Sequence, residues 1–433
     1  MKKRISIVLA VLFFLFFAAC TGSGGGTNLT AAPEPTGQTT PADTTAEPRE
    51  PLTYKEVYDP ETDFDNRFGN GQDSLVETED AYYFASFCAS YLYYYDKASG
   101  ERGVLCGKPE CTHDSTPDNK SCNGYVGLIG TMGCWDGRLH YVTDSIPGKV
   151  TLMSVKLDGT DKRADTALDI IIDDIWYTPQ RFDYHRGRLY GWCVTDVVTG
   201  GEPKKETCIL SLDPNTGATQ KIYSIEADHG YDTTLFYFGK YIYFYLGYIE
   251  ATDNDGWITH LELRRLDTET EETEDVFISD KDGYLGSRMN FLVASEDLIY
   301  LMPLMLPEGE SGSLYKLEGG ELSIVFDFDT DGIGFVFDGV AFVGNPSKKH
   351  MEIRRLDGSL IYSGKWDLGT LDETVPITEP TYYFSSVFGD ENELIICLRI
   401  LGKKGEHNTG VCLVRYDLTG DEPAATVLAY DPW

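Results

Sequence analysis

Residues 135–142 read Trp-Asp-Gly-Arg-Leu-His-Tyr-Val, and residues 155–160 read Val-Lys-Leu-Asp-Gly-Thr. The first stretch is a tight turn that leads into a Tyr-containing strand, and the second is a strand that ends in another turn. The same order of strands and turns occurs seven times along the chain. The first turn of each copy falls at positions 80, 136, 187, 239, 297, 338 and 391, so that successive copies are 41 to 58 residues apart.

Four strands per unit at this spacing are typical of a β-propeller blade. We therefore predict an all-β chain with a single propeller over residues 51–433, most simply with seven four-stranded blades; six or eight blades are the main alternatives. Helical periodicity is not sustained anywhere, which excludes an α-solenoid. Thr426 to Tyr430 already supplies the last strand of the seventh blade, although Leu52-Thr53-Tyr54 could instead add a closing strand.

The first twenty residues have the features of a lipoprotein signal peptide. Met1 to Arg4 is basic, Ile5 to Phe17 is apolar but too short to cross a bilayer, and small residues precede Cys20. This pattern resembles a bacterial lipobox, which implies a signal peptide over residues 1–19 and lipidation of Cys20. The expected location is the extracytoplasmic face of the cell membrane, held by the lipid; an ordinary secreted protein is the alternative.

Residues 20–50 are predicted to form a flexible tether behind the lipidated cysteine. Apart from Leu29 they contain no large apolar side chain and are rich in Thr, Gly, Pro and Ala. The formal charge of the chain is −34, and removal of Lys2, Lys3 and Arg4 would change it to −37 (−34 − 3). So negative a protein repels phosphates, which argues against a nucleic-acid partner and against direct contact with anionic lipids.

Ten cysteines are present, of which nine remain after Cys20. Cys193 and Cys208 are 15 residues apart, as are Cys397 and Cys412, and each pair falls on two neighbouring strands of one blade. Such residues can lie opposite one another if the strand register agrees, and an extracytoplasmic location favours oxidation. We predict a disulfide in each pair, with two buried thiols as the alternative.

The other five cysteines are Cys88, Cys106, Cys111, Cys122 and Cys134. Three of them lie in one loop between the first and second blades, and Cys88 is expected to face this loop from a turn of the first blade. Cys134 is expected to be the odd, buried thiol.

Two chemistries fit this loop. Cys88, Cys106, Cys111 and Cys122 could form two disulfides that staple an otherwise structureless insertion. Cys106, Cys111, His113 and Cys122 could instead bind zinc, although their spacing is irregular for a zinc knuckle. A loop with neither remains a third possibility.

In the first blade and the cysteine-rich loop, the chain resembles a family of lipid-anchored β-propeller proteins of Gram-positive, largely anaerobic bacteria. The residues that carry the resemblance are Tyr93-Tyr94-Tyr95-Asp96, Cys106, Cys111, His113, Cys122 and Asn123. The resemblance implies the propeller fold and the membrane anchor. The family is of unknown function, so the resemblance implies no ligand.

One acidic motif has the opening of a calcium loop. Asp327, Asp329 and Asp331 alternate before Gly332. However, Phe335 stands at a usual ligand position, so a blade linker with solvated carboxylates is the alternative. No motif for a nucleophile elbow, a P-loop or a zinc protease is present.

These observations favour a cell-surface lipoprotein whose propeller binds a ligand or a protein. The expected partner is an extracellular protein or a cell-wall glycan, and no cofactor is indicated beyond the metal candidates. An extracytoplasmic enzyme is the second hypothesis, namely a polysaccharide lyase or hydrolase with its site in the propeller funnel. A structural envelope protein is the third.

Overall fold

The computed structural model describes residues 51–69, 73–86, 91–113, 121–126, 131–146, 149–179, 181–251, 257–279, 288–304, 312–345, 348–365, 381–401 and 408–432. The predicted signal peptide, Cys20 and the tether lie outside these residues. Pro51–Trp433 forms one compact unit with its own core. None of the helices within the described residues is long and apolar enough to span a membrane.

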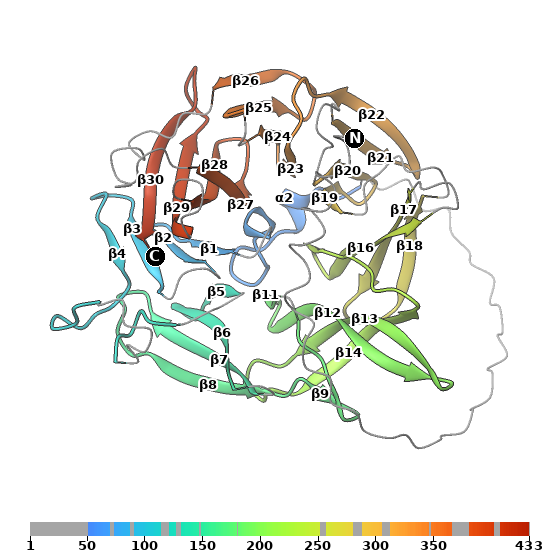
Figure 1. Cartoon of the computed structure of the whole chain (residues 1–433), viewed down its shortest axis with the longest axis horizontal. Coiled ribbons are helices and arrows are strands. Elements are labelled where there is room, and N and C mark those ends of the chain that lie inside the picture. The colour runs from blue at the N-terminus through green and yellow to red at the C-terminus, as the bar shows by residue number, and fades with distance from the viewer. Residues whose placement is uncertain are drawn as a thin grey trace, which may run out of the picture. The chain divides into compact units, whose positions relative to one another are not determined.

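Seven four-stranded antiparallel sheets form a ring of blades, which confirms the predicted fold (Figure 1). Blade 1 comprises β1 (Asp73–Glu77), β2 (Ala81–Ser86), β3 (Tyr93–Asp96) and β4 (Arg102–Val104). Blade 2 comprises β5 (Met132–Trp135), β6 (Arg138–Ile146), β7 (Lys149–Lys156) and β8 (Arg163–Leu168). A small hairpin of β9 (Ile171–Ile172) and β10 (Ile175–Trp176) follows. Blade 3 comprises β11 (Asp183–His185), β12 (Arg188–Thr199), β13 (Glu202–Leu212) and β14 (Thr219–Ala227).

The remaining blades repeat this order. Blade 4 comprises β15 (Leu235–Phe238), β16 (Tyr241–Ala251), β17 (Trp257–Asp267) and β18 (Thr273–Ile278). Blade 5 comprises β19 (Met289–Ser295), β20 (Leu298–Pro303), β21 (Ser313–Glu318) and β22 (Glu321–Asp327). Blade 6 comprises β23 (Ile333–Phe337), β24 (Val340–Asn345), β25 (His350–Arg355) and β26 (Leu360–Lys365). Blade 7 comprises β27 (Thr381–Gly389), β28 (Glu393–Leu401), β29 (Asn408–Asp417) and β30 (Ala424–Pro432).

The repeated turns connect the first two strands of each blade. At Asp136-Gly137 both residues have positive φ, 51° and 68°, and the flanking residues Trp135 and Arg138 are paired. This is the geometry of a two-residue type I′ turn, which favours Asp-Gly and matches the twist of the strands. All seven turns lie at one end of the ring, here called the turn end. The hairpins between the second and third strands lie at the other end, the hairpin end.

The core is divided among the joints between blades rather than gathered in one place. One apolar cluster joins blades 1 and 2, and others join blades 2 and 3, blades 3 and 4, and blades 6 and 7. Because each sheet buries both of its faces, apolar residues follow one another without alternation, as in Leu394 to Leu398, all fully buried.

Residues 51–69, the first segment of the chain that the structure describes, fill the axis of the ring. This segment contains the short helices α2 (Tyr54–Val57) and η2 (Asn66–Phe68), and it lies inside the ring in Figure 1. Tyr54 is buried against Phe236 of blade 4, and Phe68 packs on Phe388 of blade 7 with ring centroids 6.0 Å apart.

Hydrogen bonds fix this axial segment to several blades. The Asn66 amide accepts from the Tyr237 N–H at 3.0 Å and donates to the Tyr237 carbonyl at 2.8 Å. The Phe64 N–H donates to His185 Nδ1 at 3.1 Å, while His185 Nε2 donates to the Gly239 carbonyl at 2.8 Å. The segment therefore satisfies backbone and side-chain groups of blades 3 and 4 that would otherwise face an open channel.

Ring closure does not use a strand from the N-terminus. Thr53 forms an isolated antiparallel bridge with Ser295 of blade 5, so the prediction that residues 52–54 could close blade 7 was wrong. All four strands of blade 7 come from the C-terminal end of the chain. Blades 1 and 7 meet through side chains instead, for example where the Tyr82 hydroxyl donates to Glu393 at 2.8 Å.

Arg67 strengthens this seam from the axial segment. Its guanidinium is paired with Asp65 at 2.7 Å, with Glu77 of blade 1 at 3.1 Å and with Asp390 of blade 7 at 3.1 Å. The same group lies 4.9 Å from the centroid of the Phe68 ring. One cation therefore links the first blade, the last blade and the axial segment.

We expect Arg67→Met to lower the free energy of unfolding of Pro51–Trp433 by about 3 kcal/mol, because three partly buried carboxylates would lose their common cation. Arg163→Met is the control, since Arg163 is 54% exposed and pairs with Asp165 alone among the described residues; it should cost less than about 1 kcal/mol. Urea unfolding measures both values. Equal losses in the two variants would contradict a special role for Arg67.

Stability should also fall in mild acid because of His185. Burial lowers its pKa to about 4 against the opposing effect of Asp63, while Arg186 lowers it further. Between about pH 6.5 and pH 4 the unfolded chain binds a proton that the folded chain does not, so the free energy of unfolding falls as pH falls. His185 contributes up to about 1.4 kcal/mol per pH unit, and His140, also lowered to about 4 chiefly by burial, adds to it.

The measurement is urea unfolding of wild type and of His185→Gln between pH 7.5 and pH 4.5. The variant should be less stable at pH 7.5 and lose less stability on acidification. A variant with the same pH slope as the wild type would show that His185 does not carry this dependence.

Candidate functional site

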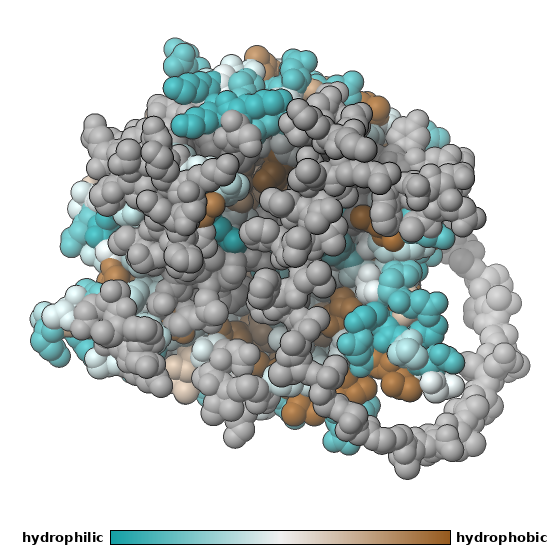
Figure 2. All heavy atoms as spheres, in the orientation of Figure 1, coloured by the Kyte–Doolittle hydropathy of each residue, from teal (hydrophilic) through white to brown (hydrophobic). Residues whose placement is uncertain are grey.

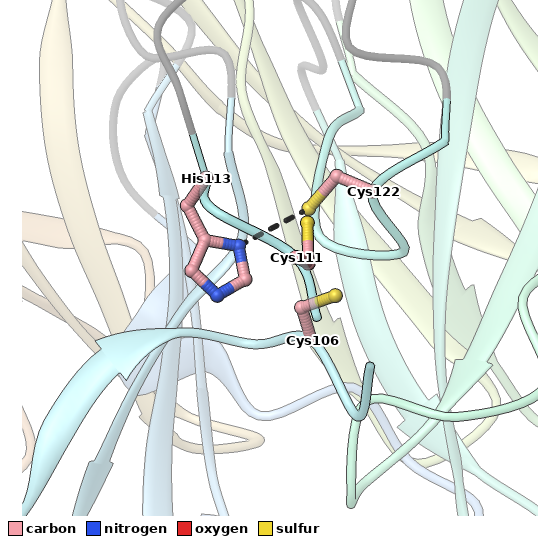
Figure 3. A group of neighbouring side chains, drawn as sticks. All are labelled: Cys106, Cys111, His113 and Cys122. Atoms are coloured by element: carbon pink, nitrogen blue, oxygen red, sulfur yellow. Dashed lines mark hydrogen bonds between the residues drawn. The ribbon is translucent and has the colours of Figure 1, made fainter. Parts of the chain in front are cut away.

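Four side chains in the loop between β4 and β5 converge on one point. Cys106, Cys111, His113 and Cys122 each offer one ligand atom, and these atoms lie within 4.8 Å of one another. Figure 3 shows the imidazole turned toward the sulfurs, with Nδ1 of His113 3.5 Å from Sγ of Cys122. This is the group that can hold a metal ion within the described part of the chain.

The loop reaches this geometry through backbone contacts on both sides. Cys106 follows the outer strand β4, and the next residue, Gly107, donates its N–H to the Gly159 carbonyl of blade 2 at 3.0 Å. A Cβ at Gly107 would lie 2.4 Å from Thr160 Cγ2, so glycine allows this close approach. His113 has a φ of 49°, a left-handed conformation that is uncommon outside glycine.

The three sulfurs differ in environment. Burial raises the pKa of Cys106, but backbone N–H groups of Lys108 and Asn123 outweigh it, and the net pKa is lowered. Cys122 is fully buried, and burial together with the neighbouring thiols of Cys111 and Cys106 raises its pKa to about 12. With their thiols deprotonated, the three cysteines can bind a tetrahedral metal ion together with His113. Alternatively, two of the three cysteines can form one disulfide.

An open groove of about 370 Å³ adjoins this cluster. Its walls include Cys106 and His113 on one side and Leu157 and Asp158 of blade 2 on the other, with Tyr94 between them. The cluster therefore forms part of the joint between blades 1 and 2 and part of a solvent-accessible surface.

The predicted cross-strand pair in blade 3 is well placed for a disulfide. Cys193 and Cys208 are direct partners in the β12–β13 register, both are fully buried, and their sulfurs are 3.3 Å apart as thiols. Oxidation of this pair remains a prediction.

The predicted cysteine pair in blade 7 is not placed to form a disulfide. Cys397 is opposite Leu413, and Cys412 is opposite Leu398, so the two cysteines are offset by one residue. Because side chains alternate between the faces of a sheet, Cys397 and Cys412 point to opposite sides of blade 7 and pack in different clusters. The predicted disulfide between them was wrong, since the register rules it out.

The two remaining cysteines are Cys134 and Cys88. Cys134 is exposed rather than buried, because β5 ends one residue later at the turn end, outside the core between blades. Cys88, proposed to face the cysteine-rich loop, lies outside the described residues.

The structure does not bring the calcium candidates together. Asp327 accepts a hydrogen bond from the Ser313 hydroxyl at 2.6 Å, and Asp329 is exposed and 3.4 Å from Arg354. Asp331 is buried and pairs with Lys348 and with the Asn345 amide. Each carboxylate is thus directed to a different neighbour, and Asp331 is buried whereas Asp329 is exposed.

The central funnel also differs from expectation. Between the axial segment and blades 4 to 7, the remaining cavity has a volume of about 20 Å³, enough for about one water molecule. A polymer or a sugar does not fit there, so the predicted active site inside the funnel is not supported.

A second candidate site lies on the long hairpins of blades 3 and 4 at the hairpin end. Strand β12 has 12 residues and β13, β16 and β17 have 11 each, whereas β20 and β21 of blade 5 have six. Side chains between the two hairpins form what we call the hairpin surface: Val194, Val198, His229, Tyr231, Tyr248 and His260. The sequence alone did not predict His229, Tyr231 and Tyr248 as a site, because packing between neighbouring blades brings them together.

The aromatic part of the hairpin surface is closely stacked. Tyr248 lies between His229 and His260, with ring centroids 4.0 and 4.3 Å away, and Tyr231 meets it edge-on at 5.5 Å. His260 Nε2 is 3.0 Å from the Glu250 carboxylate. The four residues are half-buried, so this stacked cluster reaches solvent at its edges.

The aliphatic part lies on β12. Val194 is 37% exposed and Val198 is 75% exposed, the highest value among large hydrophobic residues in the described part of the chain. Both point to the same side of β12, and Val194 packs beside Gly230, the residue between His229 and Tyr231. Figure 2 shows hydrophobic residues next to hydrophilic ones over this region, at the lower right.

The chain matches no protein-family model and no curated protein. Among solved structures it is similar to TolB from Acinetobacter baumannii, with 15% identity over 64% of this chain and 61% of TolB and a TM-score of 0.34. Similarity to a prolyl endopeptidase has 13% identity over 84% of this chain and 51% of that one, with a TM-score of 0.46. An uncharacterized protein from Listeria monocytogenes EGD-e gives 13% identity over 68% and 79%, with a TM-score of 0.38.

The chain thus spans about three fifths of the TolB chain and about half of the endopeptidase chain. Similarity at this level concerns the fold alone. The propeller fold is shared by binding proteins and enzymes, so function has to be argued from the sites.

The strand registers predict different oxidation of the two cysteine pairs. In protein isolated without reductant and alkylated before digestion, Cys193 and Cys208 should be recovered as one linked peptide, whereas Cys397 and Cys412 should both be alkylated. Peptide mapping by mass spectrometry measures this. A Cys397–Cys412 link would show that the register of blade 7 is incorrect.

Proposed function

We propose that this protein is a lipid-anchored, extracytoplasmic binding module that holds a partner protein on its hairpin surface. The observation that carries the proposal is the pair of exposed residues Val194 and Val198 on one side of β12, of which Val194 packs beside Gly230, next to the stacked Tyr248 cluster. Exposed apolar residues next to rigid aromatic residues, with a polar rim, are typical of protein interfaces.

The anchor rests on the sequence pattern before Cys20. The axial segment starts at the turn end, where the Glu296 N–H donates to the Leu52 carbonyl at 3.1 Å and Lys55 pairs with Asp338 at 3.4 Å. The start of the described unit, at Pro51 and Leu52, therefore lies at the turn end, whereas the hairpin surface lies at the opposite end of the ring.

A protein partner fits the hairpin surface better than a glycan does. Sugars stack on open aromatic faces, but both faces of Tyr248 are covered by His229 and His260. The most exposed contact is the aliphatic Val198, and the nearby rim includes exposed Glu250 and Asp228. A partner with apolar side chains flanked by basic residues would complement this surface.

An enzyme remains the second hypothesis on fold grounds only, since propellers include enzymes. The filled axis leaves the described residues without a funnel site for it. A structural envelope role is the third hypothesis and would not require a specific surface.

The test compares one substitution on the hairpin surface with a matched one elsewhere. Val198→Lys places a cation opposite the apolar side chains of the proposed partner and next to its flanking basic residues. Ile324→Lys is the control: it makes the same kind of change on β22 of blade 5, at a residue that is 53% exposed and does not belong to the hairpin surface. Immobilised Pro51–Trp433 is used to capture proteins extracted from the envelope of producing cells, and each captured protein is then purified and its Kd measured.

We expect a partner whose Kd rises at least tenfold for Val198→Lys and changes less than twofold for Ile324→Lys. Raising the salt concentration should also weaken binding, because charge attraction is screened. A partner that binds both variants equally, or a thermal shift with cell-wall glycans but with no protein, would overturn the proposal. Cell fractionation tests the anchor, since Cys20→Ser should move the protein out of the membrane fraction.

A further inference from the structure

Independently of that proposed function, we propose that Cys106, Cys111, His113 and Cys122 bind one zinc ion in a closed tetrahedral site that fastens the loop after β4 to blade 2.

The donor atoms have the right type, number and separation. Three cysteines and one histidine are a common ligand set for structural zinc. With Zn–S of about 2.3 Å and Zn–N of about 2.0–2.1 Å, a sulfur and a nitrogen at two corners of a tetrahedron are about 3.6 Å apart. The Sγ of Cys122 and Nδ1 of His113 are 3.5 Å apart, and all four ligand atoms lie within 4.8 Å.

The histidine orientation supports the same conclusion. Figure 3 shows Nδ1 directed to the sulfurs and Nε2 directed away from them. The left-handed backbone at His113 turns the imidazole inward, at some conformational cost for a residue with a side chain. A disulfide would not require the imidazole in this position.

Disulfide chemistry also leaves this group incomplete. Within the described residues, any bond between two of Cys106, Cys111 and Cys122 leaves the third thiol beside the imidazole; Cys88, the fourth cysteine of the two-disulfide alternative, lies outside these residues. Cys122 is fully buried, which makes it hard to reach for oxidation or exchange. One zinc ion uses all four donors at once.

The local charges suit a zinc site. Three thiolates and Zn²⁺ carry a net charge of −1, and two lysines lie beside the cluster in a chain with a formal charge of −34. The Lys108 ammonium donates to the Ser121 carbonyl, and the Lys162 ammonium donates to the Tyr125 carbonyl. Both ammonium groups thus contact the turn that carries Cys122, where they can balance the negative charge of the zinc site.

The site would act structurally. Four protein ligands leave no open position for a reacting water molecule. The loop that they close is bound to blade 2 at Gly159, whose carbonyl accepts from the Gly107 N–H at 3.0 Å and from the Asn123 amide at 2.8 Å, and close by at Lys162. Zinc would therefore hold blades 1 and 2 together and fix the wall of the adjoining groove.

The first test is the metal content of the full chain extracted from membranes in neutral detergent, and of Pro51–Trp433, both purified without chelator. We expect about one zinc per chain. Replacement of zinc by Co²⁺ should give the intense visible absorption of a tetrahedral site and the near-ultraviolet bands of thiolate ligands. Cys111→Ser should lose most of the metal, whereas Cys134→Ser, which removes an exposed cysteine elsewhere, should keep it.

His113→Cys is the second variant, and it should retain one metal ion because it supplies a fourth thiolate. This variant keeps the test decisive if Cys111→Ser fails to fold. Less than about 0.1 metal per wild-type chain, or a peptide map that finds Cys106, Cys111 or Cys122 in a disulfide, would overturn the proposal. The hairpin variant Val198→Lys should keep its zinc, which separates this result from the fate of the proposed function.

Discussion

Blades 1 and 7 are held together by a shared apolar cluster, which includes Phe68, Leu75 and Phe388, and by the pairing of Arg67 with three carboxylates. A propeller has to join its last blade to its first, and within residues 51–432 as described no strand is exchanged between these two blades. Arg67 instead brings a cation from the axial segment to Glu77 of blade 1 and to Asp390 of blade 7. Because these groups are largely shielded from water, their attraction is screened less than that of a surface pair.

This mode of closure has a consequence for function. The segment that carries Arg67 occupies the axis and leaves room for about one water molecule. The candidate sites among the described residues lie away from the axis. The two remaining candidate regions lie at joints between blades: the cysteine and histidine cluster between blades 1 and 2, and the hairpin surface between blades 3 and 4. In both, neighbouring blades supply parts of one site.

The repeat made the fold predictable in advance. Turn residues such as Asp136-Gly137 are needed because of their backbone conformation, and that need is visible in the sequence wherever the turn recurs. The convergence of Cys106, Cys111, His113 and Cys122 was also predictable, because all four belong to one short loop. The calcium motif failed because Asp327, Asp329 and Asp331 each pair with a different residue, Ser313, Arg354 and Lys348 respectively, and these pairings are not visible in the local spacing.

The sequence by itself determined the number of blades, the position of their turns and the grouping of the loop cysteines, because each depends on residues close together in the chain. The tertiary structure alone decided three further features. A one-residue offset in register separates Cys397 from Cys412. Packing of distant segments places residues 51–69 on the axis, and the contact of blades 3 and 4 brings His229 to Tyr248. Register and packing between blades depend on long-range contacts, which local patterns do not encode.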